Sequence, residues 1–129
     1  MNRDSDFASL PPGLDRTVLD ILSKRVGRDQ ALPRPRLLAL VRSMPASKTV
    51  SDRQLRACIN GLRKSGAPIC SAGGEDGGYW QAADWDELTE YLEREVHPRA
   101  MDLLEQEQAL KREAERRWGQ YSRQFRLGV

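Results

Sequence analysis

Twelve residues in the middle of the chain, "ICSAGGEDGGYW" from Ile69 to Trp80, constrain the fold more than any other stretch. Four glycines surround a Glu–Asp pair, between an apolar start and an aromatic end. A phosphate-binding glycine loop needs a following helix whose N–H groups face the phosphate, and two central carboxylates would repel that ligand. Here the strand-like Tyr79 and Trp80 follow the loop. Because glycine and Asp tolerate the positive φ of a tight turn, we predict a β-hairpin.

The residues before the hairpin predict a well-capped helix. Ser51 is a favourable N-cap, and Gln54 three residues later completes the pattern of a capping box. Gly66 suits the position that follows a helix C-terminus. The apolar residues of this segment fall on one helical stripe and are expected to face the core: Leu55, Cys58, Ile59 and Leu62.

Two shorter helices are predicted upstream. Apolar residues recur at helical spacing over 14–26, and Gly27 supplies a stop. Residues 31–32 fit a very short edge strand, after which Pro33 and Pro35 open a second helix, because proline is tolerated in a first helical turn. The polar residues 1–12 end in two prolines and are expected to form a flexible arm before a domain over 13–83.

Residues 84–129 predict one long charged helix. Asp84 can cap it, with Glu87 at the matching third position, and Pro98 should kink or split it. Trp80 and Trp85 are expected to close the seam between this helix and the hairpin. Acidic residues dominate its first half and basic residues its last half, which suits the helix dipole.

An apolar seam with 3-4 spacing runs along this helix and is interrupted by Glu107. Its members are Val96, Ala100, Leu103, Leu110, Ala114 and Tyr121. The seam either folds back on its own domain or pairs with a partner. We favour self-association, because the preceding domain is too small to cover about 60 Å of helix. Two parallel copies would place the Glu107 carboxylates opposite each other, so we expect an antiparallel or offset homodimer.

Charge is distributed unevenly along the chain. Residues 1–66 hold 13 Lys/Arg against 6 Asp/Glu, whereas residues 67–129 hold 8 against 13. A basic half is a precondition for nucleic-acid contact, although it equally suits a solvated surface. No apolar run reaches the roughly 20 residues that span a bilayer, and the two cysteines are too few for a disulfide scaffold. We expect a reduced, cytoplasmic protein that does not bind membranes.

The order helix, helix, capped helix and glycine-tipped hairpin resembles a winged helix-turn-helix domain. The stretch Ser51 to Trp80, "SDRQLRACINGLRKSGAPICSAGGEDGGYW", is similar to the third helix and wing of the biotin-repressor type, especially in small phage and prophage proteins. In that family the third helix enters the major groove of DNA. The sequence departs from the pattern at "LPRPR", at the long connection "SMPASKTV" and at the acidic wing tip.

The resemblance implies a DNA-binding surface on the outward side of the third helix. Arg reads guanine bidentately and Asn or Gln reads adenine, so the residue types there fit base recognition. These residues are Arg53, Gln54, Arg56, Asn60, Arg63 and Lys64, with Arg34 and Arg36 as further phosphate contacts. The first helical turn should lie deepest in the groove. The same residues also fit an ordinary solvated helix face.

Other chemistry is poorly supported. His97 is the sole histidine, and with Cys58 and Cys70 it cannot complete a four-ligand zinc site without carboxylates. We therefore expect no metal, no cofactor and no enzymatic activity. The leading hypothesis is a dimeric phage-type transcriptional regulator or site-specific binder of double-stranded DNA. The alternative is a winged-helix module that binds a protein, for example an adaptor or inhibitor of a host complex, through the C-terminal helix.

Overall fold

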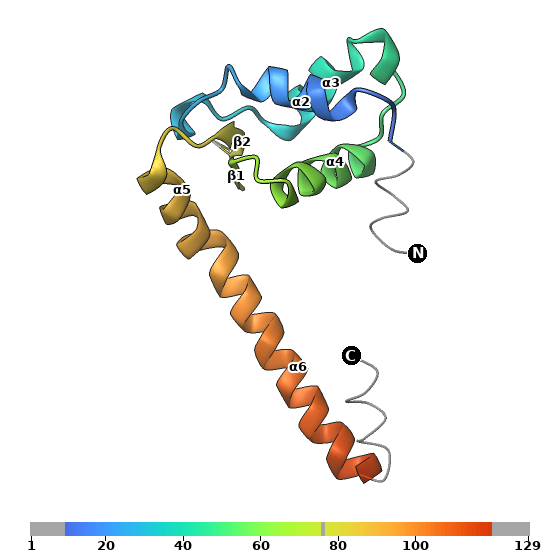
Figure 1. Cartoon of the computed structure of the whole chain (residues 1–129), viewed down its shortest axis with the longest axis vertical. Helices are drawn as coiled ribbons and strands as arrows, with labels where there is room; N and C mark the ends of the chain where they lie inside the picture. The colour runs from blue at the N-terminus through green and yellow to red at the C-terminus, as the bar shows by residue number, and fades with distance from the viewer. Residues whose placement is uncertain (1–9, 76, 120–129) are drawn as a thin grey trace. The chain divides into compact units, whose positions relative to one another are not determined.

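The computed structural model describes residues 10–75 and 77–119, and it is mainly helical with one β-hairpin (Figure 1). The chain divides into two compact units between Thr89 and Glu90. The predicted class, mainly α with a small hairpin and a long C-terminal helix, is confirmed. The main elements in chain order are α2 (Leu14–Leu22), α3 (Arg34–Arg42), α4 (Asp52–Lys64), β1 (Ile69–Ala72), β2 (Gly78–Gln81), α5 (Trp85–Tyr91) and α6 (His97–Trp118).

The core of the first unit lies among its three helices and the hairpin. Helix α2 packs against both α3 and α4, which places their apolar stripes together. Leu10 packs against this core, so the packing begins before the predicted domain start at residue 13. The fully buried apolar side chains include Leu14, Val18, Leu22, Leu32, Leu37, Val41, Val50, Leu55, Cys58 and Ile59.

Helix α4 has the predicted boundaries and orientation. The Gln54 N–H donates to Ser51 Oγ at 3.1 Å, and the Ser51 N–H donates to Gln54 Oε1 at 3.0 Å, so the capping box is complete. Gly66 follows the helix with a φ of 100°, a conformation that favours glycine. All four residues of the predicted apolar stripe are buried, which confirms the helix register.

The glycine-rich stretch is a hairpin, as predicted. Strands β1 and β2 pair antiparallel, with Cys70 opposite Trp80 and Ser71 opposite Tyr79. The Gly77 N–H donates to the Gly74 carbonyl at 3.1 Å and closes the tip. Gly78 has a φ of 144°, and a Cβ there would lie 2.3 Å from the Leu32 carbonyl oxygen, so only glycine fits.

The open edge of β2 is completed by two short upstream segments. Leu32 and Tyr79 exchange two backbone hydrogen bonds of 2.8 and 2.9 Å, which confirms the predicted edge strand. Gln81 donates to the Arg25 carbonyl at 2.8 Å and accepts from the Gly27 N–H at 2.9 Å. This pairing corrects the first predicted helix, which ends at Leu22 rather than near Val26, because the following residues pair with the hairpin instead.

Glu87 fixes the start of α5 against the hairpin. Its backbone N–H donates to Asp84 Oδ1 at 2.8 Å, and its Oε1 accepts from Trp80 Nε1 and from the Ala83 N–H, each at 3.0 Å. Trp80 therefore closes the seam as predicted. Trp85 does not, because 78% of its surface is exposed.

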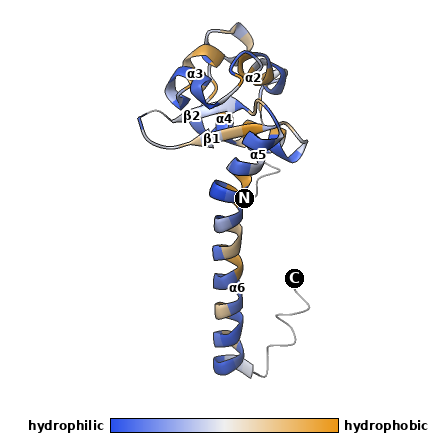
Figure 2. Cartoon of the chain, turned by 90° about the vertical axis from the view of Figure 1, so that its left-hand side faces the viewer, coloured by the Kyte–Doolittle hydropathy of each residue, from blue (hydrophilic) through white to orange (hydrophobic). Residues whose placement is uncertain are grey.

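The interruption predicted near Pro98 takes the form of a π-helical stretch, Leu92–Val96. Helix α6 then starts at His97 with Pro98 as its second residue. Because proline has no backbone N–H, Pro98 cannot donate to the helical turn before it, and the π-helical stretch lies directly before this position. None of the residues of α6 is buried. Figure 2 shows it as a largely hydrophilic helix with scattered hydrophobic positions.

Candidate nucleic-acid interface

The outward side of α4 carries a continuous polar stripe. Arg53, Asn60 and Lys64 are exposed, and their spacing places them on the face opposite Leu55 and Leu62. Ser51 caps α4, and the apolar side of α4 is buried in the core. The helix that carries the polar stripe is therefore held in place at its start and along one side. The structure thus brings these three predicted site residues onto one surface.

Asp52 organises the cations at the first turn of α4. Its Oδ1 lies 3.0 Å from Arg34 Nε, and its Oδ2 lies 3.1 Å from Arg56 Nε. One carboxylate therefore holds two guanidinium groups from different helices, and the three groups together keep one net positive charge. All three side chains are partly solvent-exposed, so water screens the attraction. The ion pairs therefore contribute little to the stability of the fold, and the carboxylate holds the two guanidinium groups close to it.

Two further predicted residues have different surroundings. The Gln54 side-chain oxygen accepts the capping hydrogen bond from the Ser51 N–H, which fixes its amide toward the helix start. Two-point recognition of adenine uses both the oxygen and the amino group, so the capping bond competes with that use of Gln54. Arg36 is exposed on α3, two residues after Arg34.

Arg63 is half-buried and tied to the hairpin. Its Nε donates to the Ile69 carbonyl at 2.8 Å, and its Nη2 donates to Ser71 Oγ at 3.0 Å. Its guanidinium carbon lies 6.0 Å from the centre of the Tyr79 ring. Arg63 therefore joins α4 to the hairpin, a role that helical spacing alone did not reveal.

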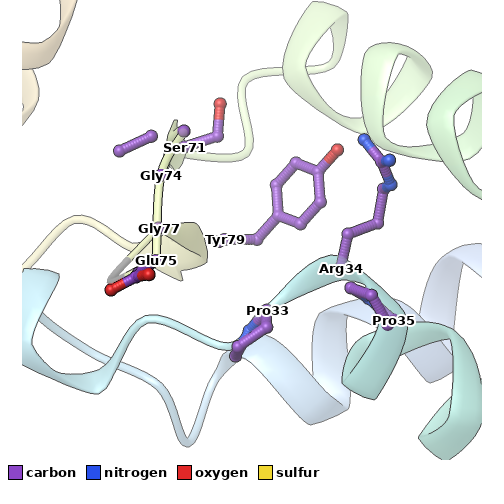
Figure 3. Close-up of a pocket in the computed structure, with 11 residues that line it drawn as sticks. Pro33, Arg34, Pro35, Ser71, Gly74, Glu75, Gly77 and Tyr79 are labelled. Atoms are coloured by element: carbon purple, nitrogen blue, oxygen red, sulfur yellow. The ribbon is translucent and has the colours of Figure 1, made fainter.

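A pocket of about 340 Å³ lies between the hairpin and the start of α3 (Figure 3). Pro33, Arg34 and Pro35 form one wall, and residues 71–75 and 77–79 form the other. Figure 3 shows the Tyr79 hydroxyl and the Arg34 guanidinium extending in the same direction, toward α4. The Glu75 carboxylate lies at the hairpin tip, away from both groups.

The two cysteines are buried and unpaired thiols. Burial raises the pKa of the Cys58 thiol to about 12, with a smaller contribution from Asp15. Burial also raises the pKa of Cys70 to about 11, assisted by Glu87 and opposed by Arg63. Protonated, buried thiols are poor nucleophiles and poor metal ligands. Among residues 10–75 and 77–119 no cluster of three or more metal-ligating side chains occurs.

Five of the six residues predicted for dimerisation are described by the structure, and they lie in the second unit. Leu103 and Leu110 are 64% and 67% exposed, and Val96 and Ala100 are also exposed. Ala114 is half-buried, and Tyr121 lies outside the described residues. Glu107, which interrupts the seam, has Lys111 Nζ at 3.7 Å from its Oε1. The positive charge of Lys111 therefore offsets the negative charge of Glu107 in the seam.

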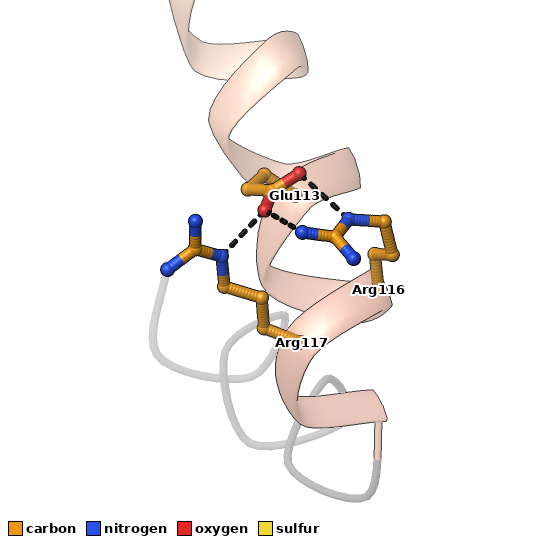
Figure 4. Close-up of polar contacts among 3 residues, drawn as sticks. All are labelled: Glu113, Arg116 and Arg117. Carbon is orange, nitrogen blue, oxygen red and sulfur yellow. Dashed lines mark hydrogen bonds and ion pairs between the residues drawn. The ribbon is translucent and has the colours of Figure 1, made fainter.

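The last turns of α6 carry an exposed charge cluster. Glu113 accepts hydrogen bonds from both Arg116 and Arg117 (Figure 4). The bonds from Arg116 and then Arg117 lower the pKa of the Glu113 carboxyl, and the same contact raises the pKa of Arg116. These i,i+3 and i,i+4 pairs support the helix locally.

The sequence matches no known family model, and comparison with curated proteins and with solved structures finds no detectable relative. In the part of the chain that the structure describes, no helix is both long enough and apolar enough to cross a membrane.

Proposed function

We propose that this chain binds double-stranded DNA in the cytoplasm through the exposed face of α4, as a phage-type transcriptional regulator or site-specific DNA binder. One observation carries the proposal: α4 is capped, buried on one side and lined with Arg53, Arg56, Asn60 and Lys64 on the other. Cationic and amide side chains on a rigid helix are suited to phosphate contact and to base-edge recognition. The winged helix-turn-helix resemblance of the sequence supports the same use of this helix.

The proposed binding does not require every predicted residue to touch DNA. Arg53, Arg56 and Asn60 are the candidates for base contact, and Lys64, Arg34 and Arg36 for phosphate contact. We assign Arg63 to holding the hairpin against α4, because two hydrogen bonds from its guanidinium end on the hairpin. The acidic tip at Glu75 does not favour contact with phosphate.

We also propose that two copies associate through α6. Residues 97–107 of α6 carry three acidic side chains and one basic one, whereas residues 108–118 carry four basic and two acidic ones. An antiparallel pair places the acidic half of one helix beside the basic half of the other and covers Leu103 and Leu110. Pairing two weakly binding domains would raise DNA affinity through effective concentration.

The test of DNA binding uses fluorescence anisotropy with labelled genomic fragments at about 50 and about 200 mM salt. We expect some fragments to bind more tightly than others and all to weaken steeply with salt, because bound cations release counterions. A chain that binds no fragment at the lower salt concentration would refute DNA binding.

The alternative function, a module that binds a protein partner, is favoured by the exposed apolar side chains of Trp85, Leu103 and Leu110. Failure to bind DNA together with a monomeric state in solution would leave these side chains for such a partner.

A further inference from the structure

We propose that the pocket between the hairpin and α3 holds one phosphate group of a nucleic-acid backbone, with the Tyr79 ring packed against the adjoining sugar. This inference rests on the proposed DNA binding and adds a contact site beyond the face of α4. The pocket of about 340 Å³ is at the small end of ligand pockets, which run from about 300 to 1,000 Å³. That size suits a sugar–phosphate unit rather than a base pair.

Two hydrogen-bond donors extend from the walls of the pocket. Asp52 engages Nε of Arg34 at 3.0 Å, which fixes the plane of the guanidinium and leaves its two Nη groups as donors. Among the described residues the Tyr79 hydroxyl has no hydrogen-bond partner. Figure 3 shows both groups extending toward α4 from the pocket walls. A guanidinium and a phenolic hydroxyl that line one pocket can both donate to the acceptor oxygens of a phosphate.

The walls of the pocket are held in place before any ligand arrives. Two backbone hydrogen bonds with Leu32 hold Tyr79, at 2.8 and 2.9 Å. Arg63 lies over the Tyr79 ring and also donates to Ser71 Oγ at 3.0 Å. A site already held in its binding geometry loses little freedom when a ligand binds.

The rest of the lining selects for a sugar–phosphate over a doubly charged small anion. Pro33, Pro35 and the Tyr79 ring offer apolar surface on which the C–H groups of a sugar can pack. The carboxylate of Glu75 lines the opposite end, and Asp52 offsets part of the charge of Arg34. The negative end repels a doubly charged anion more strongly than a singly charged one. The pocket should therefore bind a phosphodiester, which carries one negative charge, in preference to a free phosphate.

The same chemistry could be supplied by DNA or by a free nucleotide, and nuclear magnetic resonance separates the two. The backbone amide signals of Gly73, Gly74, Gly77 and Gly78 report on the pocket, and those of α4 report on its outer face. The full chain is titrated with a duplex that it binds, with thymidine 5′-monophosphate and with inorganic phosphate. We expect the duplex to shift both sets of signals, and the two small probes to shift the pocket signals only at far higher concentration.

Variants test the two donors separately. Tyr79→Phe removes only the hydroxyl and keeps the ring, and we expect it to weaken duplex binding about fivefold. Arg34→Gln should weaken it by at least as much and reduce the salt slope by about one unit. Arg16→Gln, an exposed change on α2 outside the pocket, is the matched loss of charge and should have the smaller effect. Unchanged thermal unfolding shows that each variant is folded.

Each result assigns or removes the site. If the duplex shifts α4 signals but not the pocket glycines, and both pocket variants bind like Arg16→Gln, the inference is wrong while DNA binding stands. If no duplex binds and the mononucleotide still shifts the glycines, the pocket holds a free nucleotide, and both the backbone assignment and the proposed function fail. If no probe moves the glycines, the pocket holds no phosphate.

Discussion

Arg63 joins the last turn of α4 to the hairpin, because its Nε lies 2.8 Å from the Ile69 carbonyl oxygen and its Nη2 lies 3.0 Å from Ser71 Oγ. It is one of a row of cations that the sequence alone assigns to a ligand. In the folded chain Arg63 contacts the hairpin instead. The cations of α4 therefore fall into two groups: those that face solvent, and Arg63, which supports the hairpin.

The first prediction follows from this contact. Arg63→Ala should lower the free energy of unfolding by about 1.5–3 kcal/mol, the range for hydrogen bonds made by a charged group. Lys64→Ala, the exposed neighbour, should change it by no more than about 0.5 kcal/mol. Urea unfolding followed by tryptophan fluorescence measures both values. Equal stability of the two variants would mean that Arg63 does not hold the hairpin.

A second prediction separates the two faces of α4. Leu55 is fully buried, so Leu55→Ala should destabilise the domain by about 2–5 kcal/mol through the cavity it leaves. Arg56→Ala removes only an exposed ion pair and should cost about 1 kcal/mol or less, yet it should abolish specific DNA binding. Unfolding curves and anisotropy titrations on both variants test this. A folded Arg56→Ala protein that keeps its sequence preference would show that Arg56 does not contact bases.

The third prediction concerns the carboxylate shared by two arginines. Asp52→Asn removes one negative charge beside the proposed DNA surface, so it should tighten DNA binding and steepen its dependence on salt. The amide oxygen can still accept from one guanidinium. The change should cost about 0.5–1 kcal/mol of stability, because an acidic group in the first helical turn is lost.

Anisotropy titrations at two salt concentrations compare this variant with Asp20→Asn, an exposed acid on α2. Weaker binding by Asp52→Asn would show that its hold on Arg34 and Arg56 matters more than its charge.

A fourth prediction uses the pH dependence of stability. The folded-state pKa of Cys58 is raised from 9.0 to about 12, mainly by burial. Folding therefore favours the protonated thiol, and this contribution is complete below pH 9 and is lost as pH rises toward 12. We expect stability to fall above about pH 9, and Cys58→Ala to fall less steeply. Parallel alkaline slopes in the two proteins would contradict this.

The sequence predicted the local structure of the first unit well, because each signal there is a short-range one. Ser51 and Gln54 cap a helix by contacts three residues apart, and glycines with an Asp define a hairpin tip. The end of the first helix at Leu22 could not be predicted from the sequence, because Val26 continues the helical spacing of apolar residues. The boundary is set by the backbone pairing of Val26 with Gln81, a residue more than fifty positions away in the sequence.

Residue types in the sequence indicate which side chains could form the candidate site, but not how these side chains are arranged. Asp52 stands four residues before Arg56, a spacing that signals their ion pair, yet nothing local links it to Arg34 on another helix. From the sequence alone, Tyr79 is a strand residue with no indicated ligand. Its place in a pocket depends on the approach of α3 to the hairpin, which is a property of the tertiary fold.

The last prediction is that the chain forms an antiparallel dimer through α6. Leu103 and Leu110 are more exposed than any other described leucine, and a helix with no buried residue gains little stability by itself. The full chain should sediment as a dimer at tens of micromolar, about the range of ordinary dimer affinities. Replacing both leucines with serine should give a monomer, whereas Met101→Ser on the opposite face should not.

Orientation can be measured on the same dimer. The acidic and basic halves of α6 attract each other only when the two helices run in opposite directions, which keeps the two copies of His97 apart. Pyrene attached through His97→Cys should therefore show no excimer emission, because the buried native thiols react slowly and stacked labels need adjacent sites. Strong excimer emission would mean parallel pairing, with Lys111 beside each Glu107 as the group that relieves their repulsion. A full-length monomer would leave the leucines of α6 to a different protein.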